Sequence, residues 1–177
     1  KGTNPVDGST DIIGAPGSPA GGVSGGFNQS GGEDTVTTPF TNTTPISDWL
    51  LPEPQVNMNV LPDTFNKAVK LAKSLGRPIR INSGYRPPEY NAKVGGAKKS
   101  QHVQKKAIDI RWPEGDFSSR IAFIQLAIDA GFTGIGCYNS FMHADTSTKR
   151  CWGPSGGRAS MYQQYVSVLR KNGYTVG

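Results

Sequence analysis

The sequence predicts an α+β fold, in which helices pack against a small, mainly antiparallel sheet to form a compact domain. Two observations lead to this prediction. In residues 45–177, apolar stripes with helical spacing are interspersed with short runs of alternating apolar and polar residues, a mixture typical of α+β domains. Residues 1–44 show neither pattern, and a length of 177 residues suits one domain with a proper core.

Residues 1–44 are predicted to form a flexible arm that precedes the domain. They consist mostly of Gly, Ser, Thr and Pro, and they carry one Lys against four acidic residues. Such a segment buries too little apolar area to offset the conformational entropy that it would lose on ordering. Charge divides the chain at the same place, because the net charge is −3 over residues 1–44 and +9 over residues 45–177.

The first helix of the domain is expected over residues 62–75. Pro62 suits the first turn, Asp63 complements the helix dipole, and apolar residues recur every three or four positions. Gly76 is placed to end this helix. The alternating run over residues 79–82 then predicts the first strand.

A turn-rich connection leads to a short helix over residues 88–94. The apolar run over residues 107–112 predicts the second strand. Residues 118–130 are apolar on most sides, which predicts a largely buried helix, and Gly131 is placed to cap it.

The C-terminal third is expected to add two strands and a helix. The strands cover residues 133–138 and 141–145, and the two residues between them suit a hairpin turn. The last helix is expected over residues 158–171, because apolar residues recur there with helical spacing.

The basic domain suggests a polyanionic partner, with a generally basic soluble surface as the alternative. Lysines 98, 99, 105 and 106 cluster in one stretch and favour an anionic substrate or cell-wall polymer. Nucleic acid is not expected, because aromatic and basic residues do not interleave as in base-stacking proteins. No apolar run approaches the roughly 20 residues that span a bilayer.

Asp109 and the two histidines indicate a metal site. Asp109 lies among apolar neighbours in a predicted strand, where a carboxylate needs a cation, hydrogen-bond donors or a metal. The histidines are His102, a short distance before it, and His143, in the predicted strand 141–145. Two imidazoles and one carboxylate would leave one position of a tetrahedral zinc ion free, as in catalytic rather than closed structural sites.

Several separate motifs carry a family resemblance. They are Ile81-Asn82-Ser83-Gly84-Tyr85-Arg86, Asn91 with Val94-Gly95-Gly96, Ser100-x-His102 with Ala107-x-Asp109, Gly134-Ile135-Gly136-x-Tyr138, and Phe141-x-His143-x-Asp145. Together, and in this order, they resemble the M15 family of zinc peptidases. The likeness is closest to its phage and bacterial peptidoglycan-cutting members, of the D-alanyl-D-alanine carboxypeptidase type, whose fold is shared with the hedgehog signalling domain. It covers the chain from about Pro45 to the end.

The resemblance implies roles for single residues. The implied ligands of one zinc ion are His102, Asp109 and His143. Arg86 would reach the carbonyl or carboxylate of the substrate, where a guanidinium offers two parallel donors. Tyr138 would contact the substrate. Ser100 would either contact the substrate or hold a metal ligand in place.

Two positions depart from the family pattern. Lys105 stands where family members usually have Gly, so the turn between the first two ligands is expected to be built differently. Ser140 stands where many members have the acid that acts as the general base. Asp145 is the first candidate for that base, because it lies two residues from His143 and faces the same side of a strand. Its alternative role is an acceptor that orients a ligand or an arginine.

Cys137 and Cys151 bracket His143, and three interpretations of them remain open. They could form a disulfide, which suits an extracellular or virion setting. They could be two free thiols. They could also join both histidines in a closed structural zinc site.

The resulting functional hypothesis is a zinc-dependent peptidase that acts on the stem or cross-bridge peptides of peptidoglycan. The acidic arm, and a chain that begins at Lys rather than Met, favour a phage particle, with the arm in contact with other virion proteins. The expected location is the virion, as part of the tail, or the extracellular or periplasmic space, as a lysis enzyme. The alternative is a non-catalytic zinc-stabilised module that is structural or binds the cell wall.

Overall fold

The computed structural model describes residues 47–154 and 160–176, so the predicted arm over residues 1–44 lies outside the described part. The described residues contain four helices and seven strands. In order they are β1 (Leu50–Pro52), α1 (Pro62–Leu75), β2 (Ile79–Ser83), α2 (Pro88–Lys93), β3 (Ala107–Arg111), α3 (Phe117–Ala130), β4 (Gly134–Cys137), β5 (Phe141–Asp145), β6 (Arg150–Trp152), α4 (Ser160–Lys171) and β7 (Thr175–Val176). The predicted α+β class is therefore confirmed.

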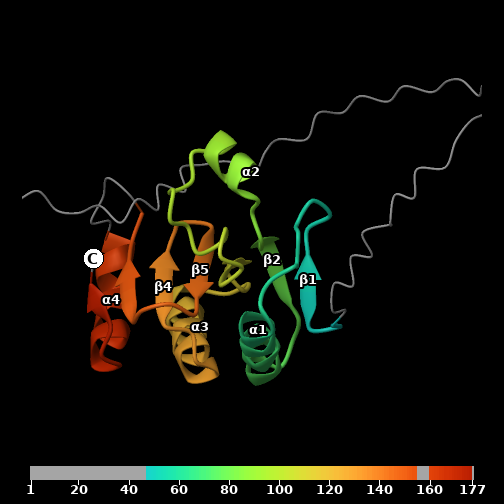
Figure 1. The fold of residues 1–177 in the computed structure, drawn as a ribbon. Helices are drawn as coiled ribbons and strands as arrows, with labels where there is room; N and C mark the ends of the chain where they lie inside the picture. The colour runs from blue at the N-terminus through green and yellow to red at the C-terminus, as the bar shows by residue number, and fades with distance from the viewer. Residues whose placement is uncertain (1–46, 155–159, 177) are drawn as a thin grey trace, which may run out of the picture.

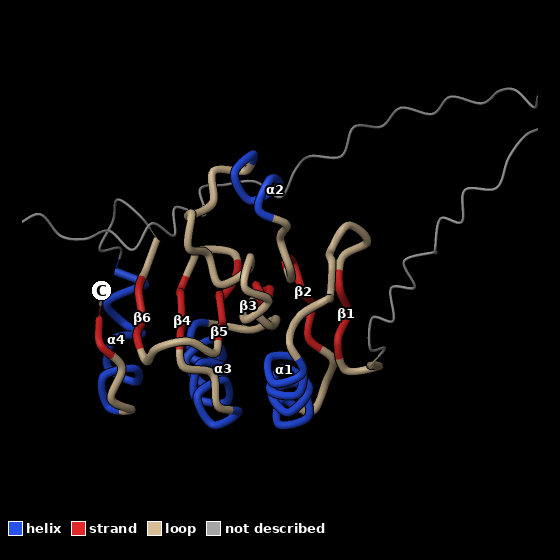
Figure 2. Tube along the Cα trace, viewed as in Figure 1, coloured by secondary structure: helices blue, strands red, loops and turns tan. Residues whose placement is uncertain are grey.

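All seven strands form one sheet, in the order β1-β2-β3-β5-β4-β6-β7. The helices α1, α3 and α4 lie side by side along this sheet, and α2 stands apart from that layer (Figure 1). A long connection of loops and turns links α2 to β3 (Figure 2). These three helices therefore pack against one face of the sheet. The other face, which we call the open face, has no such layer of helices.

The sheet is mixed, so the prediction of a mainly antiparallel sheet holds for its centre and not for its edges. The three central pairs, β2/β3, β3/β5 and β5/β4, are antiparallel, but β1/β2, β4/β6 and β6/β7 are parallel. Two of the parallel pairs arise because a helix connects their strands, α1 after β1 and α4 after β6. The strands β1, β6 and β7 have two or three residues each, too few to show a periodic pattern in the sequence.

Side chains alternate between the two faces of the central strands. On β3, Ile108 and Ile110 join the hydrophobic core, and on β5, Met142 and Ala144 do the same. The residues between them point to the opposite face, because successive side chains of a strand alternate. That face carries Asp109.

The boundaries of the helices follow local capping chemistry. α1 has the predicted bounds, and Gly76 ends it with a left-handed φ of 79° and amide hydrogen bonds to the last turn. α3 begins one residue earlier than predicted, because the Asp116 side chain accepts the Ser119 amide at 3.0 Å. The predicted start of the last helix, at Arg158, lies outside the described residues, which show α4 from Ser160.

Candidate metal centre

The three predicted zinc ligands come together at the open face of the sheet. His102 Nε2 lies 3.2 Å from Asp109 Oδ1 and 3.2 Å from His143 Nδ1, and the last two atoms are 3.0 Å apart. All three side chains are buried. Within the described ranges they form the one group of histidine, cysteine and acidic residues that could hold a metal ion.

Strand pairing positions two of these side chains. Asp109 on β3 lies directly opposite His143 on β5 in the antiparallel register. Side chains of directly opposite residues leave the sheet on the same face and stand next to each other. The apolar residues on either side of each therefore fix the orientation of the acid and the imidazole.

The third side chain comes from the connection between α2 and β3. The Nδ1 atom of His102 donates to the Gly84 carbonyl oxygen at 2.7 Å, and the His102 amide donates to Ser100 Oγ at 3.2 Å. Gly84 must be a glycine, because a Cβ there would lie 2.4 Å from the Asn57 carbonyl oxygen. Ser100 thus holds the backbone of His102.

The hydrogen-bond partners indicate which nitrogen of each histidine would face a metal ion. The Gly84 carbonyl can only accept, so Nδ1 of His102 carries the hydrogen and Nε2 offers a lone pair. Both nitrogens of His143 face a carboxylate at 3.0 Å, Nδ1 that of Asp109 and Nε2 that of Asp145. A metal ion beside Asp109 would require neutral His143 with its hydrogen on Nε2, donated to Asp145, and a lone pair on Nδ1. Two lone pairs and the Asp109 carboxylate oxygen then converge, and only a cation can hold three acceptors together.

This arrangement fits zinc. Zinc prefers imidazole nitrogen and carboxylate oxygen, and two ligands at about 2.0–2.1 Å from a tetrahedral ion lie roughly 3.3 Å apart. The observed separations of 3.0–3.2 Å are close to that value. The residues that would hold the ion are His102, Asp109 and His143.

The closeness of these side chains shifts the pKa values of His143 and Asp109. Burial lowers the pKa of His143, but hydrogen bonds and charges from Asp109 and Asp145 outweigh it and raise the pKa to about 9. Burial raises the pKa of Asp109, but the charge and hydrogen bond of His102, together with His143, hold it well below its usual range. The cluster therefore attracts positive charge, as a proton or as a metal ion.

The turn between His102 and Asp109 contains a left-handed residue. Lys105 has a φ of 61°, the one positive value among the described residues other than glycine. A side chain in this region costs about 1 kcal/mol. The Lys105 carbonyl accepts the Leu61 amide at 2.9 Å, and its ammonium lies 5.0 Å from the Tyr85 ring centroid. Lysine thus adopts the backbone conformation that a glycine would adopt freely.

Arg86 contacts a predicted ligand. Its Nη2 donates to Asp109 Oδ2 at 2.9 Å, and its Nε donates to Ser83 Oγ at 2.8 Å. Asp109 thus uses one oxygen toward the histidines and the other toward the guanidinium. The Arg86 side chain is 12% exposed, which places it at the rim of the metal centre.

Asp145 lies behind His143, and this position does not suit a general base. The His143 ring turns Nδ1 toward Asp109 and Nε2 toward Asp145, so the ring separates Asp145 from the three converging atoms. Arg150 donates to both oxygens of the Asp145 carboxylate and Ser147 donates to Oδ1, and this carboxylate is fully buried. Asp145 is therefore placed as the acceptor that orients a ligand.

The sequence prediction missed the residues of β6. Arg150 forms an ion pair with Asp145, and the ring centroid of Trp152 lies 5.2 Å from that of His143. In the sequence, only the alternation of the polar Arg150, the apolar Cys151 and Trp152 could have indicated a strand here. Three residues are too few for such a pattern to be recognised. β6 packs beside β4, which provides the two glycines described below.

Tyr138 forms part of the wall rather than an open contact surface. Its hydroxyl accepts the Trp152 indole N–H at 2.8 Å, and its ring stacks on Phe141 with a centroid distance of 4.5 Å. Its carbonyl accepts the Trp112 indole N–H at 2.8 Å. Tyr138 is buried, so the predicted substrate contact would have to involve its hydroxyl edge beside Trp152.

Cys137 and Cys151 are both buried and free, so the predicted disulfide is not formed. Cys151 pairs with Ile135 on the neighbouring parallel strand, which leaves the cysteines two residues out of register. This offset separates their Cα atoms by about 8 Å, beyond the reach of a disulfide. Neither cysteine belongs to the metal-binding group, so the closed zinc site is also contradicted. Burial raises the pKa of both thiols, that of Cys151 to about 11.

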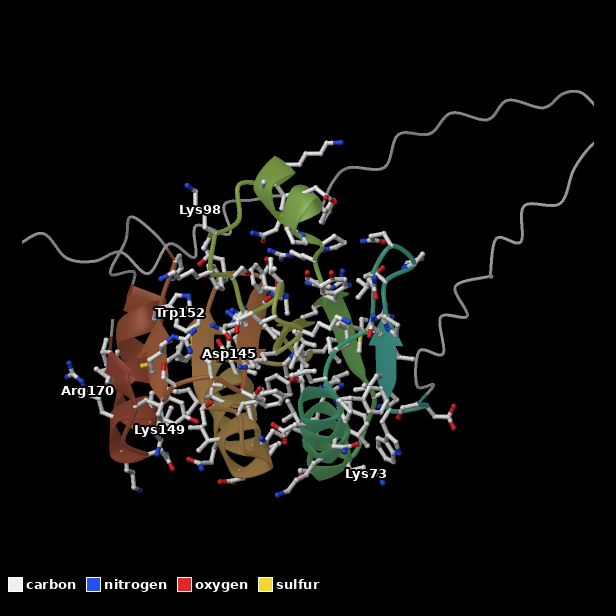
Figure 3. All side chains as sticks on the ribbon, viewed as in Figure 1. Lys73, Lys98, Asp145, Lys149, Trp152 and Arg170 are labelled. Carbon is white, nitrogen blue, oxygen red and sulfur yellow. The ribbon has the colours of Figure 1, made fainter. Side chains whose placement is uncertain are left out.

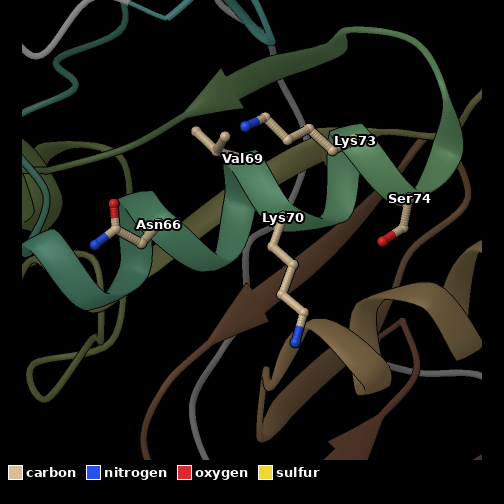
Figure 4. A pocket seen from close by; sticks show the side chains of 5 residues that line it. All are labelled: Asn66, Val69, Lys70, Lys73 and Ser74. Atoms are coloured by element: carbon tan, nitrogen blue, oxygen red, sulfur yellow. The ribbon is translucent and has the colours of Figure 1, made fainter.

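Other surface features lie away from this centre. A hollow on α1 is lined by Asn66, Val69, Lys70, Lys73 and Ser74, none of which belongs to the metal-binding group (Figure 4). In Figure 3, Asp145 and Trp152 lie within the body of the domain, whereas Lys98 and Arg170 extend from its periphery. No described helix is long and apolar enough to cross a membrane.

Comparison with known proteins agrees with the geometry. The family model described as Peptidase M15 matches residues 41–145, more than half of the chain and all three predicted ligands. No curated protein matches the chain closely enough to count as a relative. Peptidases of this family depend on zinc for the hydrolysis of peptide bonds. Because this family model matches more than half of the chain, the chain belongs to the Peptidase M15 family.

Proposed function

We propose that this protein is a zinc-dependent hydrolase of peptide bonds in the stem or cross-bridge peptides of peptidoglycan. The observation that carries the proposal is the convergence of His102 Nε2, Asp109 Oδ1 and His143 Nδ1, which lie 3.0–3.2 Å from one another. A zinc ion bound there would act as a Lewis acid and would lower the pKa of a bound water molecule. The hedgehog-type fold expected from the sequence belongs to the same proposal.

The surrounding residues have separate roles in this proposal. Gly84 and Asp145 fix the tautomers of the two histidines, so that both present a lone pair to the ion. Arg86 holds Asp109 and stands at the rim, where its guanidinium would donate to a substrate carbonyl or carboxylate.

The charge of the domain supports an anionic substrate. Peptidoglycan stem peptides carry free carboxylates, which a basic surface attracts. Lys93, Lys98 and Lys99 are exposed on α2 and the connection that follows it, the same connection that delivers His102. The substrate would therefore approach the ligands along a basic rim.

The proposal is tested by digestion of purified peptidoglycan with the zinc-loaded protein. New amino termini should appear, and chelator or His143→Ala should abolish them. Arg80→Gln is a matched control, because Arg80 is an exposed arginine on β2 whose partner is Glu53 rather than a ligand. Amino termini that still appear after chelation would contradict the proposal.

A second candidate function is a non-catalytic, zinc-stabilised module that binds the cell wall or has a structural role. Two observations favour it. The position expected to hold the general base is Ser140, which is exposed in the turn between β4 and β5. Asp145 already accepts hydrogen bonds from His143, Ser147 and Arg150. Binding to peptidoglycan without new amino termini would support this module.

The setting proposed from the sequence is a phage particle, in its tail or as a lysis enzyme, with the arm in contact with other virion proteins. Its support is the difference in charge between the arm and the basic domain. Purified virions that are probed with an antibody against residues 45–177 would test it. A signal in lysates but none in virions would contradict a virion role.

A further inference from the structure

We propose that Arg150 is a positioning residue that acts on His143 through Asp145, so that strand β6 completes the metal centre. The inference rests on the proposed zinc site, but it assigns a role to a strand that lies beyond the family match, which ends at residue 145. Arg150 does not touch the three converging atoms. It acts on the carboxylate that holds the imidazole from behind.

The contacts form a continuous chain. Arg150 Nη2 donates to Asp145 Oδ2 at 2.9 Å, and Arg150 Nη1 donates to Asp145 Oδ1 at 3.1 Å. Asp145 Oδ2 accepts the Nε2 hydrogen of His143 at 3.0 Å. A planar guanidinium that binds both oxygens fixes the plane of the carboxylate, which a single point charge would not do.

Ser147 completes the set of donors around Asp145. Its amide and its hydroxyl donate to Asp145 Oδ1 at 2.9 Å and 2.8 Å, and its hydroxyl oxygen accepts from Arg150 Nη1 at 2.8 Å. The Asp145 side chain has no exposed surface, and that of Arg150 is 22% exposed. A carboxylate that is buried in this way remains charged only because these donors replace water.

Two glycines of β4 make room for this strand. Gly134 pairs with Arg150, and a Cβ at Gly134 would lie 2.3 Å from both Asp145 carboxylate oxygens and 2.4 Å from Arg150 Nη1. Gly136 pairs with Trp152, and a Cβ there would lie 2.7 Å from the indole ring. The side chains of Arg150 and Trp152 therefore lie across β4 toward β5, where Arg150 contacts Asp145 and Trp152 packs near His143.

The physical consequence is a fixed imidazole. The contact with Asp145 favours the tautomer of neutral His143 that carries its hydrogen on Nε2 and presents Nδ1 to an ion. Arg150 keeps Asp145 ionised and oriented, so that it remains a strong acceptor for that proton. Loss of such a supporting group typically weakens metal binding by about 10- to 100-fold.

The test is the zinc affinity of the full chain, measured by competition with a chromophoric chelator. Arg150→Gln should bind zinc about 10- to 100-fold more weakly than the wild type, and Arg150→Lys should fall between the two. Arg80→Gln, a matched exposed arginine with a carboxylate partner elsewhere, should bind zinc like the wild type. A Co²⁺-substituted Arg150→Gln protein should also show altered visible absorption bands, because the geometry around His143 changes.

These measurements distinguish a failure of the role of Arg150 from a failure of the proposed function. Arg150→Gln with unchanged zinc affinity and an unchanged Co²⁺ spectrum overturns the role of Arg150, whereas a wild type that binds no zinc overturns the proposed function as well. If Arg150→Gln does not fold, Ser147→Ala serves instead, because it removes one hydroxyl and retains the ion pair. That variant should lose about 2- to 10-fold in zinc affinity, as expected for one hydrogen bond, and no loss would overturn the role of this network.

Discussion

The two faces of the central strands follow different rules, although they alternate along the same residues. On the helix face, Ile108, Ile110 and Met142 are fully buried among other apolar side chains. On the opposite face, Asp109 and His143 are just as buried, but each polar atom has a specified partner.

The two faces therefore place different requirements on the sequence. An apolar face needs side chains of suitable size, and another apolar residue of similar volume serves nearly as well. The polar face needs a particular atom at a particular place, because a buried donor or acceptor without its partner is costly. We therefore expect substitutions on the helix face to change stability, and those on the polar face to change metal binding.

The largest expected effect is on the polar face, at Asp109. Asp109→Asn keeps the shape of the side chain but removes the charge that the ion and Arg86 share. Zinc affinity should fall by at least about 100-fold, more than for loss of a supporting residue. Isothermal titration of zinc into the apo protein measures it. Wild-type affinity in this variant would remove Asp109 from the ligand set.

The corresponding change on the helix face is Ile110→Ala, one residue along the same strand. Ile110 is fully buried in the core, so the truncation should lower the free energy of unfolding by roughly 2–5 kcal/mol. Denaturant unfolding of the apo protein measures this loss. The zinc affinity of the folded fraction should remain that of the wild type. A parallel loss of zinc affinity would show that the two faces are not separable.

The pH dependence of the apo protein should reveal the polar face alone. The pKa of His143 is raised from 6.5 to about 9, so its contribution is fully present below pH 6.5 and is lost as the pH rises through about 9. The free energy of unfolding should therefore fall by up to about 3 kcal/mol across this window. Denaturant titrations with chelator present measure it. His143→Gln, which does not titrate, should show a nearly flat profile there.

The smallest expected effect concerns the turn that delivers His102. Lys105→Gly should be more stable than Lys105→Ala by about 1 kcal/mol, because glycine adopts a φ of 61° without strain. Both variants lose the contact with Tyr85, so their difference reports the backbone alone. Thermal unfolding of the two variants measures it. Equal stabilities would show that the turn changes conformation when Lys105 is replaced.

The helices and the central strands could be predicted from the sequence, but the short strands at the edges of the sheet could not. α1 followed from Pro62 and Gly76, which are local signals, and β5 from its alternation. The strands at the edges were missed because their pairing depends on distant partners, as for Arg150 opposite Gly134. The parallel pairs at the edges were not foreseen for the same reason, since direction is decided by crossovers rather than by strand composition.

The site was predictable as a set of residue types but not in its orientation. His102, Asp109 and His143 were found from their motifs, and the structure places them together. Whether Asp145 faces the ion or lies behind His143 depends on which ring nitrogen points where, and strand alternation gives only the face. The pairing of Asp145 with Arg150 decides this, and it lies in a strand that the sequence does not reveal.

X-ray absorption at the zinc edge can show whether zinc is held by two imidazoles and one carboxylate. We expect one zinc ion per chain with only nitrogen and oxygen neighbours at about 2.0–2.1 Å, and with two imidazole signatures that are lost in part in His143→Ala. Sulfur neighbours at about 2.3 Å, or an unchanged spectrum in that variant, would contradict it.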